Sequence, residues 1–301
     1  MTEISELELE FLQELSDTTT IKIGILEKDY TKFYEAIKDE PEFEDPEELK
    51  RYLELMMRAK FQSRPPTKPR QIIPIGMDQI RKAKKSGDIY SSLYVIDIKK
   101  DLRRITFNAD VCDKLHDIQL FYPYKDVELT EYSKSNDFLA DDRSDFSKFV
   151  DKKLDIESVL ELTKAKKLTL SEILTTTDKR KIKENLSKVD DQGWSIKTDW
   201  RAIHGMVENI KLSEEDTDGT NSGWLSLTDN SINVSKELFD KKGVKIRKNI
   251  RVWTSPLVAG NITKYSECWI LGPLGQNPKT GEITMNGFCV LLTRKSPIDE
   301  E

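Results

Sequence analysis

The sequence of 301 residues is poor in the residue types that most often build metal and redox sites, with 2 histidines and 3 cysteines. Cys112, Cys268 and Cys289 are odd in number and far apart, and at least two lie in apolar runs. This pattern favours buried thiols in a reducing compartment over disulfides. No CxxC pair is present, so the usual structural zinc site lacks ligands. The sequence therefore predicts no metal site.

Long apolar runs and common catalytic motifs are also missing. No stretch approaches the roughly 18 apolar residues of a membrane helix, and residues 1–17 are acidic where a signal peptide is basic and then apolar. The phosphate-loop, nucleophile-elbow, zincin and dinucleotide-binding motifs do not occur. We therefore expect an intracellular, cytoplasmic protein that is not an enzyme, has no catalytic residues, needs no cofactor and contacts no membrane. A metal-dependent enzyme using Asp141, Asp142 and Asp145 is a weaker alternative.

What the sequence does contain is strongly segregated charge, although the net charge is only −6. Residues 1–57 carry 6 basic and 17 acidic side chains, whereas residues 58–104 carry 13 basic and 4 acidic ones. The basic run, which includes Lys84 and Lys85, can match a phosphate backbone. The alternative interpretation is a solvated, basic, proline-rich linker.

Hydrophobic periodicity and proline content divide the chain into five segments. Apolar residues at helical spacing predict two helices, over residues 4–15 and 49–60, in an acidic N-terminal unit. Three prolines after Phe61 predict an extended connection. The predicted segments are an acidic helical unit (1–64), a β-rich domain (65–150), a helical connector (151–193), a second β domain (194–296) and an acidic tail (297–301).

Strict alternation places large or cationic side chains on the outer faces of several predicted strands. Leu225 and Leu227 share one face, which leaves Trp224 on the other. Ile250 and Val252 likewise face inward. The side chains that this parity places outward are Trp224, Arg251 and Trp253, with Phe288 near the C-terminus and Arg104 in a predicted hairpin of the first β domain. Such a surface suits stacking of flat ligands, bases above all. Alternatively, the tryptophans cover the bottom of a barrel or an interdomain contact.

The second β domain has the strand pattern of the five-stranded Greek-key barrel called the OB-fold: five strands, a glycine in the first and a hairpin last. Residues 202–210 (AIHGMVENI), followed by 223–231 (GWLSLTDNS), resemble the opening strands of archaeal replication protein A and related single-stranded-DNA-binding OB-folds. The resemblance covers about 100 residues. It implies nucleic-acid binding on the face of strands two and three, which contains Trp224, Arg247, Arg251 and Trp253. The acidic loop 214–218 departs from this expectation because it would repel phosphate.

We therefore expect an α+β, β-rich protein with a C-terminal OB-fold, a second β domain whose strand pattern allows an OB-like barrel, a helical N-terminal unit and a helical connector. The expected function is non-catalytic binding of single-stranded nucleic acid, DNA before RNA, in replication, recombination or repair, with nucleoid association if the ligand is DNA. The alternative is a protein-interaction scaffold that uses the same aromatic face. In both interpretations the acidic helices are a candidate contact for replication or repair proteins. The candidate nucleic-acid-binding residues are Trp224, Arg247, Arg251, Trp253, Phe288, Arg104, Lys84 and Lys85.

Overall fold

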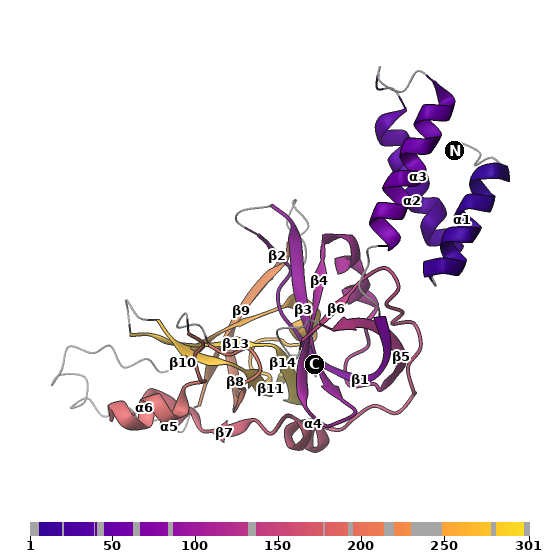
Figure 1. The fold of residues 1–301 in the computed structure, drawn as a ribbon. Helices are drawn as coiled ribbons and strands as arrows, with labels where there is room; N and C mark the ends of the chain where they lie inside the picture. The colour runs from indigo at the N-terminus through magenta and orange to yellow at the C-terminus, as the bar shows by residue number, and fades with distance from the viewer. Residues whose placement is uncertain are drawn as a thin grey trace. The chain divides into compact units, whose positions relative to one another are not determined.

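The computed structural model describes most of the chain (Figure 1). The described residues are 6–19, 21–38, 40, 45–62, 67–83, 87–131, 137–176, 178–191, 195–213, 220–229, 249–277 and 281–297. Two compact units are present: residues 1–68 with 142–144, and the remainder of the chain. Among the described helices, none has both the length and the apolar character that crossing a membrane requires.

The described part of the first unit contains three helices, which share a hydrophobic core of their own. They are α1 (Glu6–Thr19), α2 (Ile23–Ile37) and α3 (Pro46–Gln62). Leu12, Leu26 and Met57, one from each helix, are fully buried in this core. The sequence predicted α1 and α3, whereas α2 is an addition whose buried Leu26 and Tyr30 lie one helical turn apart. A role of this unit in contacting replication or repair proteins stays a prediction.

The first β domain is a closed barrel. Its main strands are β1 (Thr67–Met77), β3 (Ile89–Asp97), β4 (Leu102–Asn108), β5 (Tyr124–Glu131) and β6 (Phe138–Ala140). They follow the order β1-β5-β6-β4-β3, and β1 also pairs with β3, which closes the sheet. The short β2 (Arg81–Lys82) extends β3, and a 3-10 helix, η2 (Ala109–Asp117), follows β4. The predicted hairpin over residues 90–108 is confirmed as β3 and β4.

The segment between the barrels contains short elements. They are α4 (Ile156–Thr163), β7 (Lys166–Leu168), α5 (Leu170–Leu174) and α6 (Lys179–Asn185). Thr169 caps α5 in a reciprocal capping box with Glu172. The strand β7 is an addition to the predicted helical connector, and it pairs in parallel with the second barrel.

The second β domain is also a closed barrel (Figure 1). Its elements are β8 (Arg201–Ser213), β9 (Ser222–Thr228), β10 (Asn249–Thr254), a short helix α8 (Pro256–Ala259), β11 (Glu267–Gly272), β12 (Leu274–Gln276), β13 (Ile283–Gly287) and β14 (Cys289–Arg294). β13 and β14 are two parts of the last strand, interrupted at Phe288. β13 pairs in parallel with β10, and β14 pairs with β11, which returns to β8.

Both barrels have the OB-fold strand order. In each, strand one pairs with strands two and four, and strand three pairs in parallel with strand five. Each barrel also has a hydrophobic core of its own. The protein is therefore an α+β, β-rich chain with two OB-folds, as the sequence predicted for the second barrel and allowed for the first.

A third apolar core joins the two barrels. Tyr94 of β3 stacks on Phe288, with ring centroids 4.3 Å apart. The Met77 N–H donates to the Phe288 carbonyl. A Cβ on Gly76 would lie only 2.3 Å from that carbonyl oxygen, so glycine is required for this approach. The two OB-folds therefore pack directly on each other.

Candidate nucleic-acid interface

Trp224 and Trp253 are direct cross-strand neighbours in the antiparallel pairing of β9 with β10. The inward residues on either side, Leu225 and Val252, are fully buried in the barrel core. Trp253 is 40% exposed, and Trp224 is half-buried. The predicted parity is therefore confirmed for both tryptophans, and neither is sealed inside a core.

The tryptophans belong to an outer surface of two parallel rows, which we call the tryptophan platform. One row crosses β8, β9, β10 and β13 through the register partners Lys211, Trp224, Trp253 and Asn286. The next row consists of Asn209, Ser226, Arg251 and Thr284, of which Ser226 is buried. The platform thus combines two large aromatic rings with two cations and several short polar side chains.

Arg251 lies over both tryptophan rings. Its guanidinium carbon is 5.0 Å from the ring centroid of Trp224 and 5.8 Å from that of Trp253. These are cation–π distances. Because the arginine covers Trp224 more closely, Trp253 offers the more accessible aromatic surface, and the exposed guanidinium can itself stack on a base or bind a phosphate.

A bulge in β8 aligns this strand with the platform. The β8–β9 register shifts between Val207 and Asn209, so the extra residue Glu208 reverses the alternation. Val207 before the bulge is buried, and Asn209 and Lys211 after it are exposed. Because Lys211 lies between the apolar residues Ile210 and Leu212, strand alternation in the sequence is enough to place it outward. The sequence gives no sign of the bulge.

Hydrogen bonds join the first barrel to the edge of the tryptophan platform. Gln79, in the loop between β1 and β2, donates from Nε2 to the carbonyls of Gly223 and Thr254, at 2.7 and 2.9 Å. These two residues directly adjoin Trp224 and Trp253 in the chain. The Ile80 N–H donates to the Asn221 side chain, and the Asn221 N–H donates to the Ile80 carbonyl. The basic strand β2 therefore begins immediately beside the tryptophan pair.

Two of the predicted binding residues lie away from the platform. Phe288 is 1% exposed and stacked on Tyr94 in the apolar core between the barrels. A buried ring has no free face for a base, so the expectation for Phe288 is wrong. Arg104 lies on the first barrel, in register with Tyr94, and its Nη2 is 2.6 Å from Asp137 Oδ2. Its outward orientation is as predicted, but it does not join the tryptophans.

Other predictions fall on parts of the chain that the structure does not describe. Arg247, Lys84, Lys85, the acidic loop 214–218 and most of the acidic tail lie outside the described residues. All three cysteines are buried and free, and burial raises the pKa of the Cys112 thiol to about 11. Within the described ranges, no group of three or more histidine, cysteine or acidic side chains is placed to hold a metal ion.

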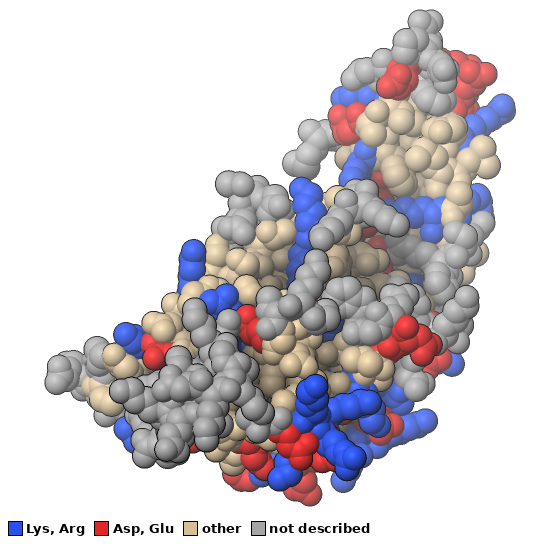
Figure 2. Space-filling model, turned by 90° about the vertical axis from the view of Figure 1, so that its left-hand side faces the viewer, with Lys and Arg blue, Asp and Glu red and all other residues tan. Residues whose placement is uncertain are grey.

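Charge is mixed on the face of the molecule that Figure 2 shows. Lysine and arginine side chains gather toward the lower edge in this view, and acidic side chains lie among them. The number of basic residues on this face therefore does not by itself define a binding surface for a phosphate backbone. The geometry of individual cations beside aromatic rings is the more specific signal.

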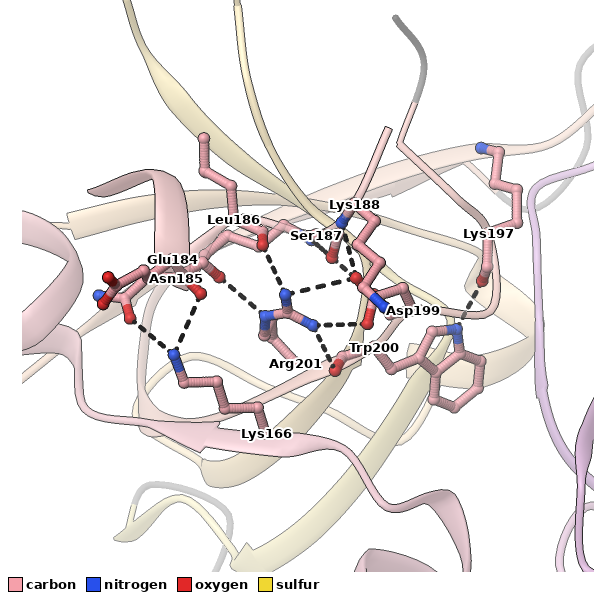
Figure 3. Close-up of polar contacts among 11 residues, drawn as sticks. Lys166, Glu184, Asn185, Leu186, Ser187, Lys188, Lys197, Asp199, Trp200 and Arg201 are labelled. Atoms are coloured by element: carbon pink, nitrogen blue, oxygen red, sulfur yellow. Dashed lines mark hydrogen bonds and ion pairs between the residues drawn. The ribbon is translucent and has the colours of Figure 1, made fainter. Parts of the chain in front are cut away.

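A buried arginine organises the start of the second barrel (Figure 3). Arg201 is 7% exposed and donates to the carbonyls of Asn185 and Leu186 and to the carboxylate of Asp199. Burial alone would raise the pKa of Asp199, but hydrogen bonds from Arg201 and the Lys188 N–H, with their positive charges, lower it. This network fixes the segment that precedes β8, and so it holds one side of the barrel that carries the tryptophan platform.

Trp200 fixes the turn before β8. Its Nε1–H donates to the carbonyl of Lys197 at 2.7 Å. In Figure 3 the Lys197 side chain lies apart from the arginine network. Its ammonium lies 5.3 Å from the ring centroid of Phe288, in the region where the two barrels meet. Nothing local in the sequence distinguishes Lys197 from the other lysines of this chain.

Comparison with known proteins gives matches at the level of three-dimensional structure only. No protein-family model matches the sequence, and no curated protein matches it. A replication protein A heterotrimer bound to single-stranded DNA matches with 11% identity and a TM-score of 0.42, over 78% of this chain and 50% of that chain. This protein thus spans half the length of the chain it matches.

Two further structures show the same kind of likeness. The single-stranded-DNA-binding protein from Thermus aquaticus, as a deletion mutant, matches with 10% identity and a TM-score of 0.23, over 78% of this chain and 98% of that one. The HINa domain of Ifi202 in complex with double-stranded DNA matches with 11% identity and a TM-score of 0.33, over 76% and 96%. The scores are low, so the assignment of two OB-folds rests on the strand order.

Proposed function

We propose that this protein binds single-stranded nucleic acid, DNA before RNA, without catalysing a reaction on it. The observation that carries the proposal is the cross-strand pair of Trp224 and Trp253 on the outer face of β9 and β10, with Arg251 over both rings. Each base–aromatic stack contributes about 1–3 kcal/mol in single-strand binding. Two stacks with salt-dependent phosphate contacts are enough for a micromolar site.

Unpaired bases are the ligand that this geometry favours. The exposed ring of Trp253 presents an aromatic face, which a base inside a duplex cannot reach because both of its own faces are already stacked. Lys211 on β8 and Arg251 on β10, the strands on either side of β9, supply positive charge for phosphate groups. Presenting or protecting single strands during replication, recombination or repair is the role that we assign to such binding.

Fluorescence anisotropy of a labelled dT oligomer of about 30 nucleotides tests the proposal, because one OB-fold occupies about 4–16 nucleotides. We expect Trp253→Ala to raise Kd about tenfold, and Trp224→Ala to raise it less, since Arg251 already covers that ring. The matched control is Trp269→Ala on β11. This tryptophan is also half-buried and lies beneath a lysine, Lys167, but it is not on the platform.

The titration is repeated at several salt concentrations and with a duplex of the same length. Phosphate contacts on single strands give a log–log slope near −0.7 for each contact. No binding by the wild type at low salt would reject the proposal and favour the protein-interaction alternative. An equal loss in Trp253→Ala and Trp269→Ala would show that the platform is not the site.

A further inference from the structure

Cations from three separate chain segments lie around the contact of Tyr94 with Phe288: Lys197 lies over the ring of Phe288, Arg104 is the register partner of Tyr94, and Arg81 lies on the neighbouring strand β2. Arg81 belongs to β2, Arg104 to β4, and Lys197 to the turn before β8. Arg81 Nη2 is 3.0 Å from Asp78 Oδ1, and Arg104 Nη2 is 2.6 Å from Asp137 Oδ2. Each arginine therefore has a carboxylate partner.

Lys197 differs from the two arginines. No carboxylate of the described residues lies within ion-pair distance of its ammonium, whose nearest recorded neighbour is the ring of Phe288. Burial lowers the pKa of Lys197. Asp78 opposes this change, and the positive charges of Arg81 and Arg104 reinforce it. The three cations thus have only two carboxylate partners, Asp78 and Asp137. A partly desolvated ammonium without an anion is energetically unfavourable.

Hydrogen-bond donors are also in excess here. The buried Nε atoms of Arg81 and Arg104 have no acceptor among the described residues. A phosphate group supplies negative charge together with several acceptor oxygens, and arginine forks match its geometry. The chemistry of the junction is thus that of a site for one phosphate.

The junction is next to the tryptophan platform. Gln79 bonds to the carbonyls beside Trp224 and Trp253, and Arg81 follows only two residues later. In the next strand, Tyr90 pairs with Arg81 and is 39% exposed. Of the three cations, Arg81 is therefore the one nearest in the chain to the Gln79 contact beside the tryptophans.

We propose that Lys197, Arg81 and Arg104 form a phosphate site that carries a nucleic-acid backbone from the second barrel onto the first. This inference rests on the proposed function, because the phosphate belongs to the strand whose bases stack on the tryptophan platform. The site exists only in the assembled pair of barrels, since its three cations come from both.

The test is Lys197→Gln, compared with the wild type on the dT oligomer of about 30 nucleotides. Removing this charge leaves no carboxylate unpaired, so the variant is expected to fold, which urea unfolding checks. We expect binding about tenfold weaker and a log–log salt slope reduced by about 0.7, the value for one lost phosphate contact. Lys197→Arg should keep the slope. Lys264→Gln is the matched control, because its exposed ammonium also lies over a ring, 4.9 Å from the centroid of Tyr265.

The outcomes separate this site from the platform. If Lys197→Gln binds with wild-type affinity and slope while Trp253→Ala is weakened, the junction site is overturned and the platform stands. Calorimetric titration with inorganic triphosphate is a second probe that needs no stacking. If the wild type binds no oligonucleotide but binds triphosphate, and Lys197→Gln loses this binding, the phosphate site stands without the proposed function. If the wild type binds neither ligand, the phosphate site is overturned as well.

Discussion

Tyr94 of the first barrel and Phe288 of the second stack with their ring centroids 4.3 Å apart and their planes inclined by 16°. Both rings are buried, and Trp200 packs against both, at 5.4 and 6.2 Å. The two OB-folds are thus joined by an aromatic core, and the site at their junction depends on it.

Truncating this core should destabilise the protein strongly. We expect Phe288→Ala to lower the free energy of unfolding by about 3–5 kcal/mol, because it removes a fully buried ring and leaves a cavity. Trp253→Ala, at an exposed position, should cost less than about 1 kcal/mol. Urea unfolding followed by tryptophan fluorescence measures both. Equal losses in the two variants would contradict the assignment of Phe288 to structure and of Trp253 to binding.

The glycine at the barrel contact should not tolerate a side chain. In Gly76→Ala the new Cβ would lie 2.3 Å from the Phe288 carbonyl oxygen, and that backbone cannot move without separating the barrels. We expect a loss of about 1–3 kcal/mol or more by the same unfolding assay. Gly24→Ala, in α2 where no atom lies within 4 Å, should be neutral or stabilising. A neutral Gly76→Ala would show that the barrels do not approach this closely.

The amide of Gln79 should hold the β1–β2 loop against the platform. Gln79→Ala removes the hydrogen bonds that two buried carbonyls accept from this amide, and we expect a cost of about 1–3 kcal/mol. The amide protons of Ile80 and Asn221, which bond across this contact, should exchange faster with deuterium. Gln276→Ala is the control, because Gln276 makes a comparable bond at an exposed site. Unchanged amide exchange rates in Gln79→Ala would show that this side chain does not hold the loop.

Acid should weaken the network at the start of β8. The folded pKa of Asp199 lies below its ordinary value of 3.8. Its ionised form therefore stabilises the fold above that value, and this contribution is lost as the pH falls through the lower folded pKa. We expect Asp199→Asn to be less stable than the wild type at pH 7, with a smaller difference at pH 3. Urea midpoints at both pH values measure this, and a constant difference would refute the charge coupling.

The sequence alone determined the features that depend on near neighbours. Alternation placed Leu225 and Val252 inward and Trp224 and Trp253 outward, because side chains on a strand change face at every residue. The β3–β4 hairpin was likewise predicted from neighbouring residues alone. The strand succession of the second barrel was also sufficient to predict an OB-fold.

Tertiary structure alone decided how the barrels meet and therefore which outward residues remain available. Parity was expected to expose Phe288. The last strand breaks at this residue, however, so Cys289 and Leu291 face the core between the barrels while Val290 faces the barrel interior. The positions of Gln79 beside the tryptophans and of Lys197 beside two arginines arise in the same way. These contacts join residues more than 90 positions apart, and a local pattern carries no information about a surface that only another domain can cover.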